Sequence, residues 1–291
     1  MRNNPGGLIL LNKPSGITSF RCLNTIKKEL GTGKVGHTGT LDKFAEGLIV
    51  ALFGKMTKLV PEFTGMDKEY EALICFGTET DTLDPEGEII GTGEPPELVG
   101  ITNAIPAFMG LIDQVPPSYS AIHIGGKRAY SLVRAGEEVS IPSRKIKIHS
   151  FEVISYKKPE LKVRIRCSKG TYIRAIARDL GIKCNSRAYL KELKRLSVGS
   201  FCLEKAIIPE KFNKSESVIT PWDVFDFLKN VEKRMVENKY INEIRIGKIE
   251  IINKISSDFP DNCEYALFDN KKDFLALIVK KEGKAYFRFV C

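Results

Sequence analysis

The chain has 291 residues, of which 43% are hydrophobic and 28% charged, and its net charge at pH 7 is +9. It is long enough to bury a sizeable core, its apolar runs fall short of the ~20 residues that span a bilayer, and its N-terminal apolar stretch is too short for a signal peptide. Because the seven cysteines are scattered and the three histidines form no cluster, we expect a cytoplasmic protein with no membrane segment, disulfide framework or metal site.

A strand and a capped helix are predicted at the N-terminal end of the chain. Residues 7–12 form a short apolar run, which is typical of a buried strand. Thr18 or Ser19 can cap a helix that runs to Leu30, and Gly31 suits its end. We therefore expect a strand, a turn and a helix in that order.

A loop rich in glycine and threonine follows this helix. The loop, residues 31–42 (GTGKVGHTGTLD), leads into the apolar run 48–52, which predicts a buried strand. A further strand is predicted at 69–77, and the turn DTLDPEGE at 81–88 predicts that this strand forms a hairpin with residues 89–90. The loop is therefore expected to lie against core structure.

The middle of the chain predicts a helix followed by three strands. Residues 97–109 are helix-like, and residues 116–139 indicate a strand, a Gly-Gly turn and a short helix that ends near Gly136. Two further strands are predicted at 145–156 and 161–168. Thus a second group of strands follows the first.

The strand at 161–168 alternates between apolar and basic residues. Its apolar residues are Leu161, Val163, Ile165 and Cys167, and the cations between them are Lys162, Arg164 and Arg166. Because side chains alternate across a strand, one face is expected to be buried and the other to carry a basic stripe. After it, Thr171 can cap a helix that runs to Leu180 and places Arg174 and Arg178 on one face.

Charge is divided unevenly along the chain. Residues 141–200 contain 16 Lys and Arg against 4 Asp and Glu, a net charge of +12, whereas residues 61–100 contain 11 acids and a single base, Lys68. A folded segment this basic favours phosphate binding over a merely solvated face, and the acidic segment would repel a polyanion. We therefore expect a nucleic acid as partner.

The remaining residues complete one domain and predict a second. Residues 186–202 indicate a strand pair broken near Gly199, and a capped helix with Pro221 in its first turn follows a polar loop at 211–218. Beyond a boundary near 230, short strands are predicted at 249–252, 264–268, 274–279 and 285–290. These patterns predict an α+β fold with a mixed, mainly antiparallel sheet over about residues 7–210, and a small β-rich segment after it.

Asp42 is the one carboxylate in the glycine- and threonine-rich loop, and His37 lies five positions before it. A lone Asp in such a loop more often caps a turn through backbone hydrogen bonds, and a lone His is more often an ordinary loop residue. Taken by themselves, these two residues leave the chemistry open.

Six blocks of the sequence, taken together and in order, resemble the signature of the tRNA pseudouridine synthase B (TruB) family of bacteria. The blocks are NKPSGITS (12–19), GHTGTLDKFAEGLIV (36–50), KEYEA (68–72), PPSYSAIHIGGKRAYSLVRAG (116–136), CSKGTYIRAIARDLG (167–181) and AYLKELKRLSVGSF (188–201). They span nearly all of residues 7–210. The probability that all six blocks agree by chance is negligible compared with the false-positive risk of a single short motif.

The resemblance implies a pseudouridine synthase core in residues 1–230. The size and strand pattern of residues 231–291 resemble the small PUA-like RNA-binding domain of many family members, although a structural cap is the alternative. The implied activity is a cofactor-free isomerase that converts uridine to pseudouridine in the T-arm (TΨC) loop of tRNA, at position 55 in tRNA numbering, after flipping the base out of its stack. We expect a monomer with no obligate protein partner.

The resemblance also implies which residues act. Asp42 corresponds to the catalytic carboxylate, and Arg174 to the arginine that keeps it ionised and oriented. Tyr70 corresponds to the tyrosine that stacks on the target base and is a candidate base for the leaving proton, and Leu193 to an apolar wall of the pocket. His37 corresponds to the residue that fills the space of the flipped base.

Candidates for phosphate contacts are Lys13, Arg144, Lys169 and the stripe at 162–166. The sequence departs from the family pattern at Lys43, Glu46, His123, Tyr189 and Lys194, where proline, a small hydroxyl residue, lysine, histidine and arginine respectively are usual. Glu46 and Lys43 lie beside the loop, so the departures bear on its RNA contacts.

Two other functions remain open from the sequence. One is a catalytic subunit directed by guide RNA within a protein complex, as in related archaeal and eukaryotic enzymes; the short chain without long basic tails favours the stand-alone form. The other is a tRNA-binding folding factor without chemistry. Modification of bare tRNA by the purified protein and by an Asp42→Asn variant separates all three.

Overall fold

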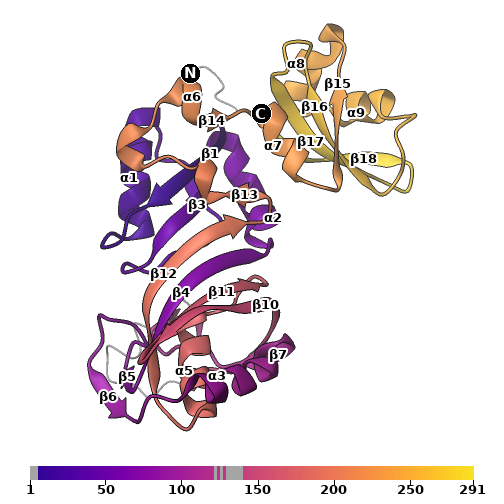
Figure 1. Ribbon diagram of the computed structural model, residues 1–291. Coiled ribbons are helices and arrows are strands. Elements are labelled where there is room, and N and C mark those ends of the chain that lie inside the picture. The colour runs from indigo at the N-terminus through magenta and orange to yellow at the C-terminus, as the bar shows by residue number, and fades with distance from the viewer. Residues whose placement is uncertain (1–5, 121–122, 125–126, 129–139) are drawn as a thin grey trace.

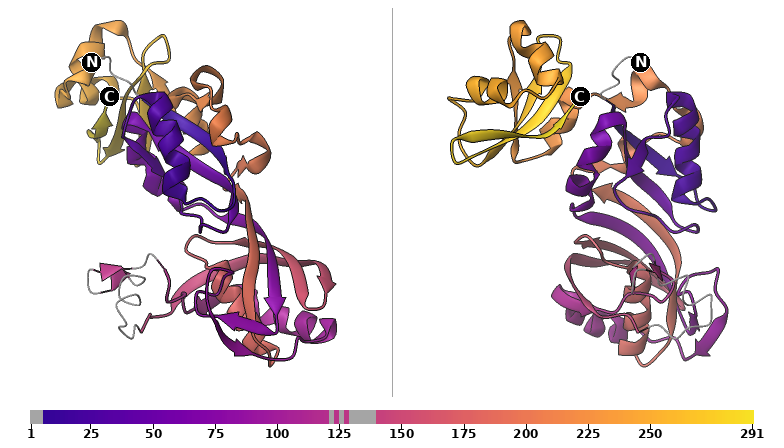
Figure 2. Two further views of the ribbon diagram at one scale, coloured as in Figure 1. Left: turned by 90° about the vertical axis from the view of Figure 1, so that its left-hand side faces the viewer. Right: turned by 180° about the vertical axis from the view of Figure 1, so that it is seen from behind.

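The computed structural model describes residues 6–120, 123–124, 127–128 and 140–291. Figure 1 shows a long, curved main sheet with helices against it, and a second sheet beside the end of the main sheet that carries β1 and α1. The two further views in Figure 2 show the same arrangement, with the C-terminal end of the chain near the junction.

The main sheet has ten strands among the described residues, in the order β14-β1-β3-β12-β4-β11-β10-β7, with β2 on β3 and β13 on β12. All pairings are antiparallel except β3 with β12. The strands are β1 (Gly7–Lys13), β2 (Val35–His37), β3 (Glu46–Phe53), β4 (Lys68–Phe76), β7 (Gly110–Gln114), β10 (Arg144–Lys157), β11 (Glu160–Cys167), β12 (Ala188–Val198), β13 (Phe201–Cys202) and β14 (Val218–Ile219). The predicted α+β class with a mixed, mainly antiparallel sheet is confirmed.

Helices and 3-10 turns connect these strands. The α-helices are α1 (Ser19–Leu30), α2 (Val60–Thr64), α3 (Leu98–Ala104), α5 (Ile173–Lys183), α6 (Lys214–Ser217), α7 (Pro221–Val224), α8 (Ile241–Arg245) and α9 (Ile249–Ile255). The 3-10 turns are η1 (Gly54–Leu59), η2 (Ile105–Phe108), η3 (Leu203–Lys205), η4 (Pro209–Lys211), η5 (Phe225–Phe227) and η6 (Asn238–Tyr240). As predicted, Thr18 caps α1 by accepting from the Arg21 amide, and Gly31 ends it with φ 61°.

Strands β1 and β3 are buried on both faces, which explains their continuous apolar runs. In β1, Ile9 and Leu11 belong to one core, shared with α1 and α5, while Leu8 and Leu10 belong to a second core on the other face. Strands covered on both sides have no polar face, so their sequences do not alternate. The predicted strand at 48–52 follows this pattern as β3.

The C-terminal sheet has the order β15 (Val231–Met235), β16 (Cys263–Phe268), β17 (Phe274–Lys281) and β18 (Lys284–Val290). Its residues Phe268, Phe274 and Phe289 share the second core with Leu8 and Leu10. The sheet therefore packs on the main domain through common apolar surface. The division into a catalytic domain of residues 1–230 and a PUA-like domain of residues 231–291 stays a prediction.

Three local expectations were wrong. Strand β4 does not form the expected hairpin; it lies between β11 and β12, and residues 89–92 pair instead with β5 (Thr78–Thr80) as β6 (Ile89–Thr92). Residues 249–252 begin helix α9, in which Ile252 is buried and Ile251 and Ile255 pack against the same core at helical spacing. Thr171 does not cap α5; its hydroxyl donates to the Ser168 carbonyl.

The expected strand within 116–139 corresponds in part to β8 (His123–Ile124), which pairs with β9 (Lys127–Arg128), whereas the expected Gly-Gly turn is not among the described residues. The helix expected to end near Gly136 lies outside the described residues. The remaining strands, at 145–156, 161–168, 186–202 and in the C-terminal segment from 264 onward, are confirmed within a few residues.

The acidic and basic segments lie side by side, because β4 is paired with β11 along its whole length. Lys162 lies 2.6 Å from Glu71, and Arg164 is 3.7 and 3.6 Å from Glu69 and Glu71. Other ion pairs between the two segments are Lys158–Glu97, Arg174–Asp84 and Arg187–Glu79. The basic segment is therefore not a free cationic face, since part of its charge is compensated within the fold.

Candidate active site

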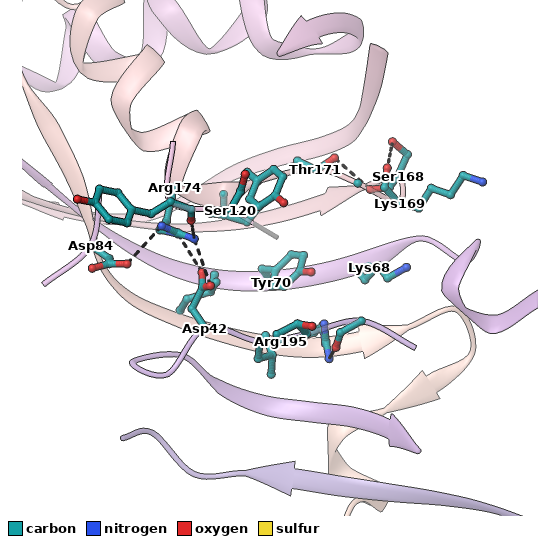
Figure 3. A pocket seen from close by; sticks show the side chains of 18 of the residues that line it. Asp42, Lys68, Tyr70, Asp84, Ser120, Ser168, Lys169, Thr171, Arg174 and Arg195 are labelled. Atoms are coloured by element: carbon teal, nitrogen blue, oxygen red, sulfur yellow. Dashed lines mark hydrogen bonds and ion pairs between the residues drawn. The ribbon is translucent and has the colours of Figure 1, made fainter. Parts of the chain in front are cut away.

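A cleft of about 830 Å³ lies where the 38–43 loop meets β4, β12 and the start of α5. The turn at 82–86, residues 119–120 and the 168–172 loop complete its lining. Figure 3 shows Asp42 and Arg174 facing each other across this cleft, with Tyr70 between Asp42 and Lys68. The cleft thus collects side chains from segments far apart in the sequence.

Asp42 and Arg174 form a two-point ion pair. The Nε atom of Arg174 lies 2.9 Å from Oδ2 of Asp42, a charge contact that is poorly aligned as a hydrogen bond, and Nη2 donates to Oδ1 at 3.2 Å. The Arg174 side chain is only 6% exposed, whereas that of Asp42 is 37% exposed. The carboxylate is therefore held by a buried guanidinium while one part of it faces the open cleft.

Arg174 is itself held by three other groups. Its Nη1 donates to the Thr82 carbonyl at 2.7 Å and lies 3.4 Å from Asp84, and its Nη2 donates to the Tyr119 carbonyl at 3.0 Å. Burial raises the pKa of Asp84, although its Oδ1 accepts from the Thr82 hydroxyl and the Glu86 amide. Asp84 was missed in the sequence, where its only signal was the DTLDPEGE turn.

Tyr70 forms part of the cleft floor on β4 and is 8% exposed. Burial raises the pKa of its hydroxyl, and the nearby Arg195 guanidinium opposes that rise. Leu193 on β12 lies beside it and is 7% exposed. Tyr70 and Leu193 therefore offer an apolar surface with one neutral phenol, suited to a planar ring.

Arg195 and Lys68 also line the floor and were missed as site residues. Arg195 is 1% exposed; its Nε donates to the Leu48 carbonyl at 2.7 Å and its Nη2 to the Gly39 carbonyl at 3.0 Å. Lys68 donates to the carbonyls of Thr64 and Met66, and burial lowers its pKa to about 8. No sequence pattern marks a cation as buried, so these two could not have been distinguished from surface charges.

A model of the TruB family pseudouridylate synthases, covering the N-terminal domain, matches residues 27–173. This range includes the loop with Asp42 and ends one residue before Arg174. The chain belongs to the TruB family. Its relatives include tRNA pseudouridine synthase B of Borreliella burgdorferi (strain ZS7), 40% identical over 291 residues that cover 98% of each chain. The enzyme of that name from Treponema denticola is 39% identical over 296 residues, 93% of this chain and 82% of its own.

Solved structures support the TruB-family fold. A chain in an H/ACA RNP bound to a substrate RNA containing 2'-deoxyuridine aligns with a TM-score of 0.65 at 20% identity, covering 98% of this chain and 85% of that one. A chain of a Cbf5-Nop10-Gar1 complex gives a TM-score of 0.66 at 21% identity, covering 98% and 84%. At these identities the likeness concerns the fold.

Two of the expected contact residues of this TruB-family chain lie elsewhere than expected. Lys13 is fully buried, and its ammonium donates to the carbonyls of Pro14, Ile17 and Lys43, so the expected phosphate contact was wrong. Its role is to hold the loop against β1. His37 lies on β2 just outside the cleft lining; its Nδ1 accepts from the Gly39 amide, and burial lowers its pKa.

Arg144 and Lys169 lie at the mouth of the cleft. The Arg144 guanidinium donates to the Gly170 carbonyl and stacks 4.6 Å from the Tyr172 ring centre, whereas Lys169 is exposed. Of the expected stripe, Lys162 and Arg164 are paired with glutamates, and Arg166 is exposed. Candidate phosphate contacts therefore concentrate at the mouth.

The charged residues among the departures from the family pattern form ion pairs. Lys194 lies 3.1 Å from Glu46, directly across the β12–β3 pairing. Lys43 lies 2.7 Å from Glu86 at the cleft rim. Both are exposed pairs, which typically contribute at most about 1 kcal/mol. Neither pair displaces Asp42 from Arg174.

Two further findings concern the described residues as a whole. They contain no group of three or more His, Cys, Asp or Glu side chains placed to hold a metal ion. Nor do they include a helix with the length and apolar character needed to cross a membrane.

Proposed function

We propose that this chain is a tRNA pseudouridine synthase that isomerises uridine in the T-arm loop, at position 55 in tRNA numbering, without a cofactor. The observation that carries the proposal is the Asp42–Arg174 ion pair at an open cleft beside Tyr70 and Leu193. The names of the relatives support the broader activity, pseudouridine formation in tRNA.

In this proposal Asp42 acts at the sugar of the target nucleotide. Arg174 keeps the carboxylate charged and aimed, so that Asp42 can attack as a nucleophile or stabilise positive charge at the sugar carbon. The C1'–N1 bond breaks, the pyrimidine rotates, and a C1'–C5 bond forms. C5 loses one proton and N1 gains one, so the isomerisation requires no redox partner.

Tyr70 is proposed as the stacking platform for the flipped base. Because burial raises its pKa, Tyr70 is a neutral phenol at pH 7 and serves as platform more readily than as base. Leu193 limits water at the detached base. His37, neutral because burial lowers its pKa, offers an uncharged ring near the loop to occupy the space of the extruded nucleotide. Arg144 and Lys169 are proposed to contact phosphates at the mouth.

The test is modification of a bare tRNA transcript by the purified chain, with the modified position mapped. We expect one pseudouridine in the T-arm loop, its loss in Asp42→Asn with tRNA binding retained, and full activity in Asp226→Asn, an exposed carboxylate outside the cleft. Unchanged modification by Asp42→Asn would refute the role of Asp42. Tight binding without modification by the wild type would favour the folding factor, and modification only with added guide RNA and proteins would favour the guided subunit.

A further inference from the structure

The cleft floor contains buried positive charge that no carboxylate of the described residues pairs with. Arg195 is among the largest fully buried side chains, and within the described part of the chain it forms no ion pair. Lys68 likewise is 7% exposed, bonds only to carbonyls there and forms no ion pair. Burying a cation without an opposing charge costs free energy. A side chain needed only to bond these carbonyls would cost less if it were a neutral hydrogen-bond donor.

The backbone is shaped to bring Arg195 to this place. Arg195 lies opposite Gly47 in the single parallel pairing of the main sheet's described strands. Gly47 has φ +107°, and a Cβ there would lie 2.4 Å from the Arg195 carbonyl oxygen. Only glycine permits this close approach of β3 to β12. The guanidinium thereby reaches the Gly39 carbonyl, three residues before Asp42.

Arg195 is also directly opposite Tyr70 across the β12–β4 pairing, and both line the cleft. Its charge acts on its surroundings: it lowers the pKa of Tyr70 against the effect of burial, and it lowers the pKa of His37 and Lys68. The other charged or titratable groups that face Tyr70 are Cys167 from β11 and Asp42 from the loop. Burial raises the pKa of Cys167 to about 12, so that thiol is neutral at pH 7.

We propose that Arg195, a positioning residue assisted by Lys68, makes the floor a site for negative charge on the detached pyrimidine, and acts through the Tyr70 hydroxyl. The proposal rests on the proposed function. When the C1'–N1 bond breaks, its electron pair remains on N1 and spreads onto O2 and O4 of the ring. In a site with little water, a fixed positive charge below that ring stabilises the anion without reorganisation. Arg195 neither gives nor takes a proton.

The first test compares the rate of a single turnover with RNA affinity in full-length variants. Arg195→Gln keeps hydrogen-bond donors but removes the charge, Arg195→Lys keeps the charge, and Lys191→Met removes an exposed charge from the same strand outside the cleft. We expect roughly a 100-fold lower rate constant for Arg195→Gln at unchanged Kd, partial rescue by Arg195→Lys and no change in Lys191→Met. Equal rates in Arg195→Gln and wild type, or equal losses in Arg195→Gln and Arg195→Lys, would overturn the proposal.

A second variant guards against a folding defect in Arg195→Gln. Lys68→Met removes the other floor cation and leaves the Arg195 bonds to Leu48 and Gly39 in place. We expect a lower single-turnover rate constant at unchanged Kd, with a loss smaller than that of Arg195→Gln. A full rate in Lys68→Met would remove the assisting role given to the lysine.

A third measurement needs no RNA and so separates this proposal from the proposed function. Ionisation of Tyr70 in the free protein is followed by tyrosinate absorbance, as the difference from Tyr70→Phe. Loss of the Arg195 charge in Arg195→Gln should shift this titration to higher pH. An unshifted titration overturns the coupling of Arg195 to Tyr70, whereas a wild type that forms no pseudouridine overturns the proposed function alone.

Discussion

Arg174→Lys should weaken the two-point contact with Asp42 while conserving the positive charge at position 174. Arg174 makes two contacts with Asp42, approaches Asp84 at 3.4 Å and donates to the carbonyls of Thr82 and Tyr119. A lysine ammonium has three donors and no planar fork, so it leaves at least two of these five contacts unmade. At about 1–3 kcal/mol for each lost contact, the free energy of unfolding should fall by about 2–6 kcal/mol.

The effect on activity should be larger than the effect on RNA binding. A carboxylate displaced by ~1 Å loses roughly 100-fold in rate, whereas phosphate contacts at the cleft mouth supply most of the affinity. Urea unfolding gives the stability, and single-turnover kinetics with excess enzyme, together with Kd for the tRNA transcript, give the function. Arg174→Ala and Tyr70→Ala should likewise reduce turnover more than affinity.

The matched control is Arg178→Lys, one turn later on the same helix. Arg178 bonds to Asp179 and to the Val115 carbonyl, away from the cleft lining, so its substitution should cost less than about 1 kcal/mol and leave the rate unchanged. The reasoning fails if Arg174→Lys matches this control in both stability and rate, or if its Kd rises as much as its rate falls.

Burial lowers the folded-state pKa of Lys68 to about 8 from an ordinary 10.5. Between these two pH values the unfolded chain binds more protons than the folded chain, so the free energy of unfolding should rise with pH from 8 to 10.5. Urea titrations should show a flatter rise in Lys68→Met, and an identical rise would contradict the assignment. Gly47→Ala should cost roughly 3 kcal/mol or more, because its Cβ would overlap the Arg195 carbonyl at a positive φ, and an unchanged melting temperature would refute this. Lys169→Ala should weaken tRNA binding and reduce the slope of log K against log salt by about one. Lys13→Met should leave that slope unchanged and lower the unfolding midpoint instead, since the Lys13 ammonium bonds only to carbonyls; a changed slope would restore it as a phosphate contact.

Local structure could be predicted wherever neighbours in sequence decide it. Helix α1 follows from its Thr18 cap and the Gly31 stop, and β11 from strict alternation of apolar and basic residues. Residues 249–252 show the limit of such patterns. A short apolar run has no clear period. Only the packing of Ile252 against buried residues of the C-terminal sheet, such as Tyr265 and Ile278, makes it a helix.

The residues of the candidate site were found by resemblance rather than from local pattern. Asp42 and Arg174 are 132 positions apart, and no spacing rule connects them. For Asp84, which lies against Arg174, the only signal in the sequence is the DTLDPEGE turn, and the cations that line the cleft floor have none. In sequence, a buried lysine or arginine cannot be distinguished from a surface charge. The sequence therefore predicts a phosphate contact for Lys13 and gives no indication that Arg195 belongs to the site.

The sequence by itself determined the ends of α1, the strands with clear alternation, the α+β class and, through six ordered blocks, the family. Tertiary structure alone decided which charges meet. The pairing of β4 with β11 compensated part of the +12 charge with glutamates of the acidic segment, and the position of β12 between β3 and β4 placed Arg195 opposite Tyr70. The physical reason is that caps and periodicity act over a few residues, whereas the cost of a buried charge depends on every group that folding brings around it.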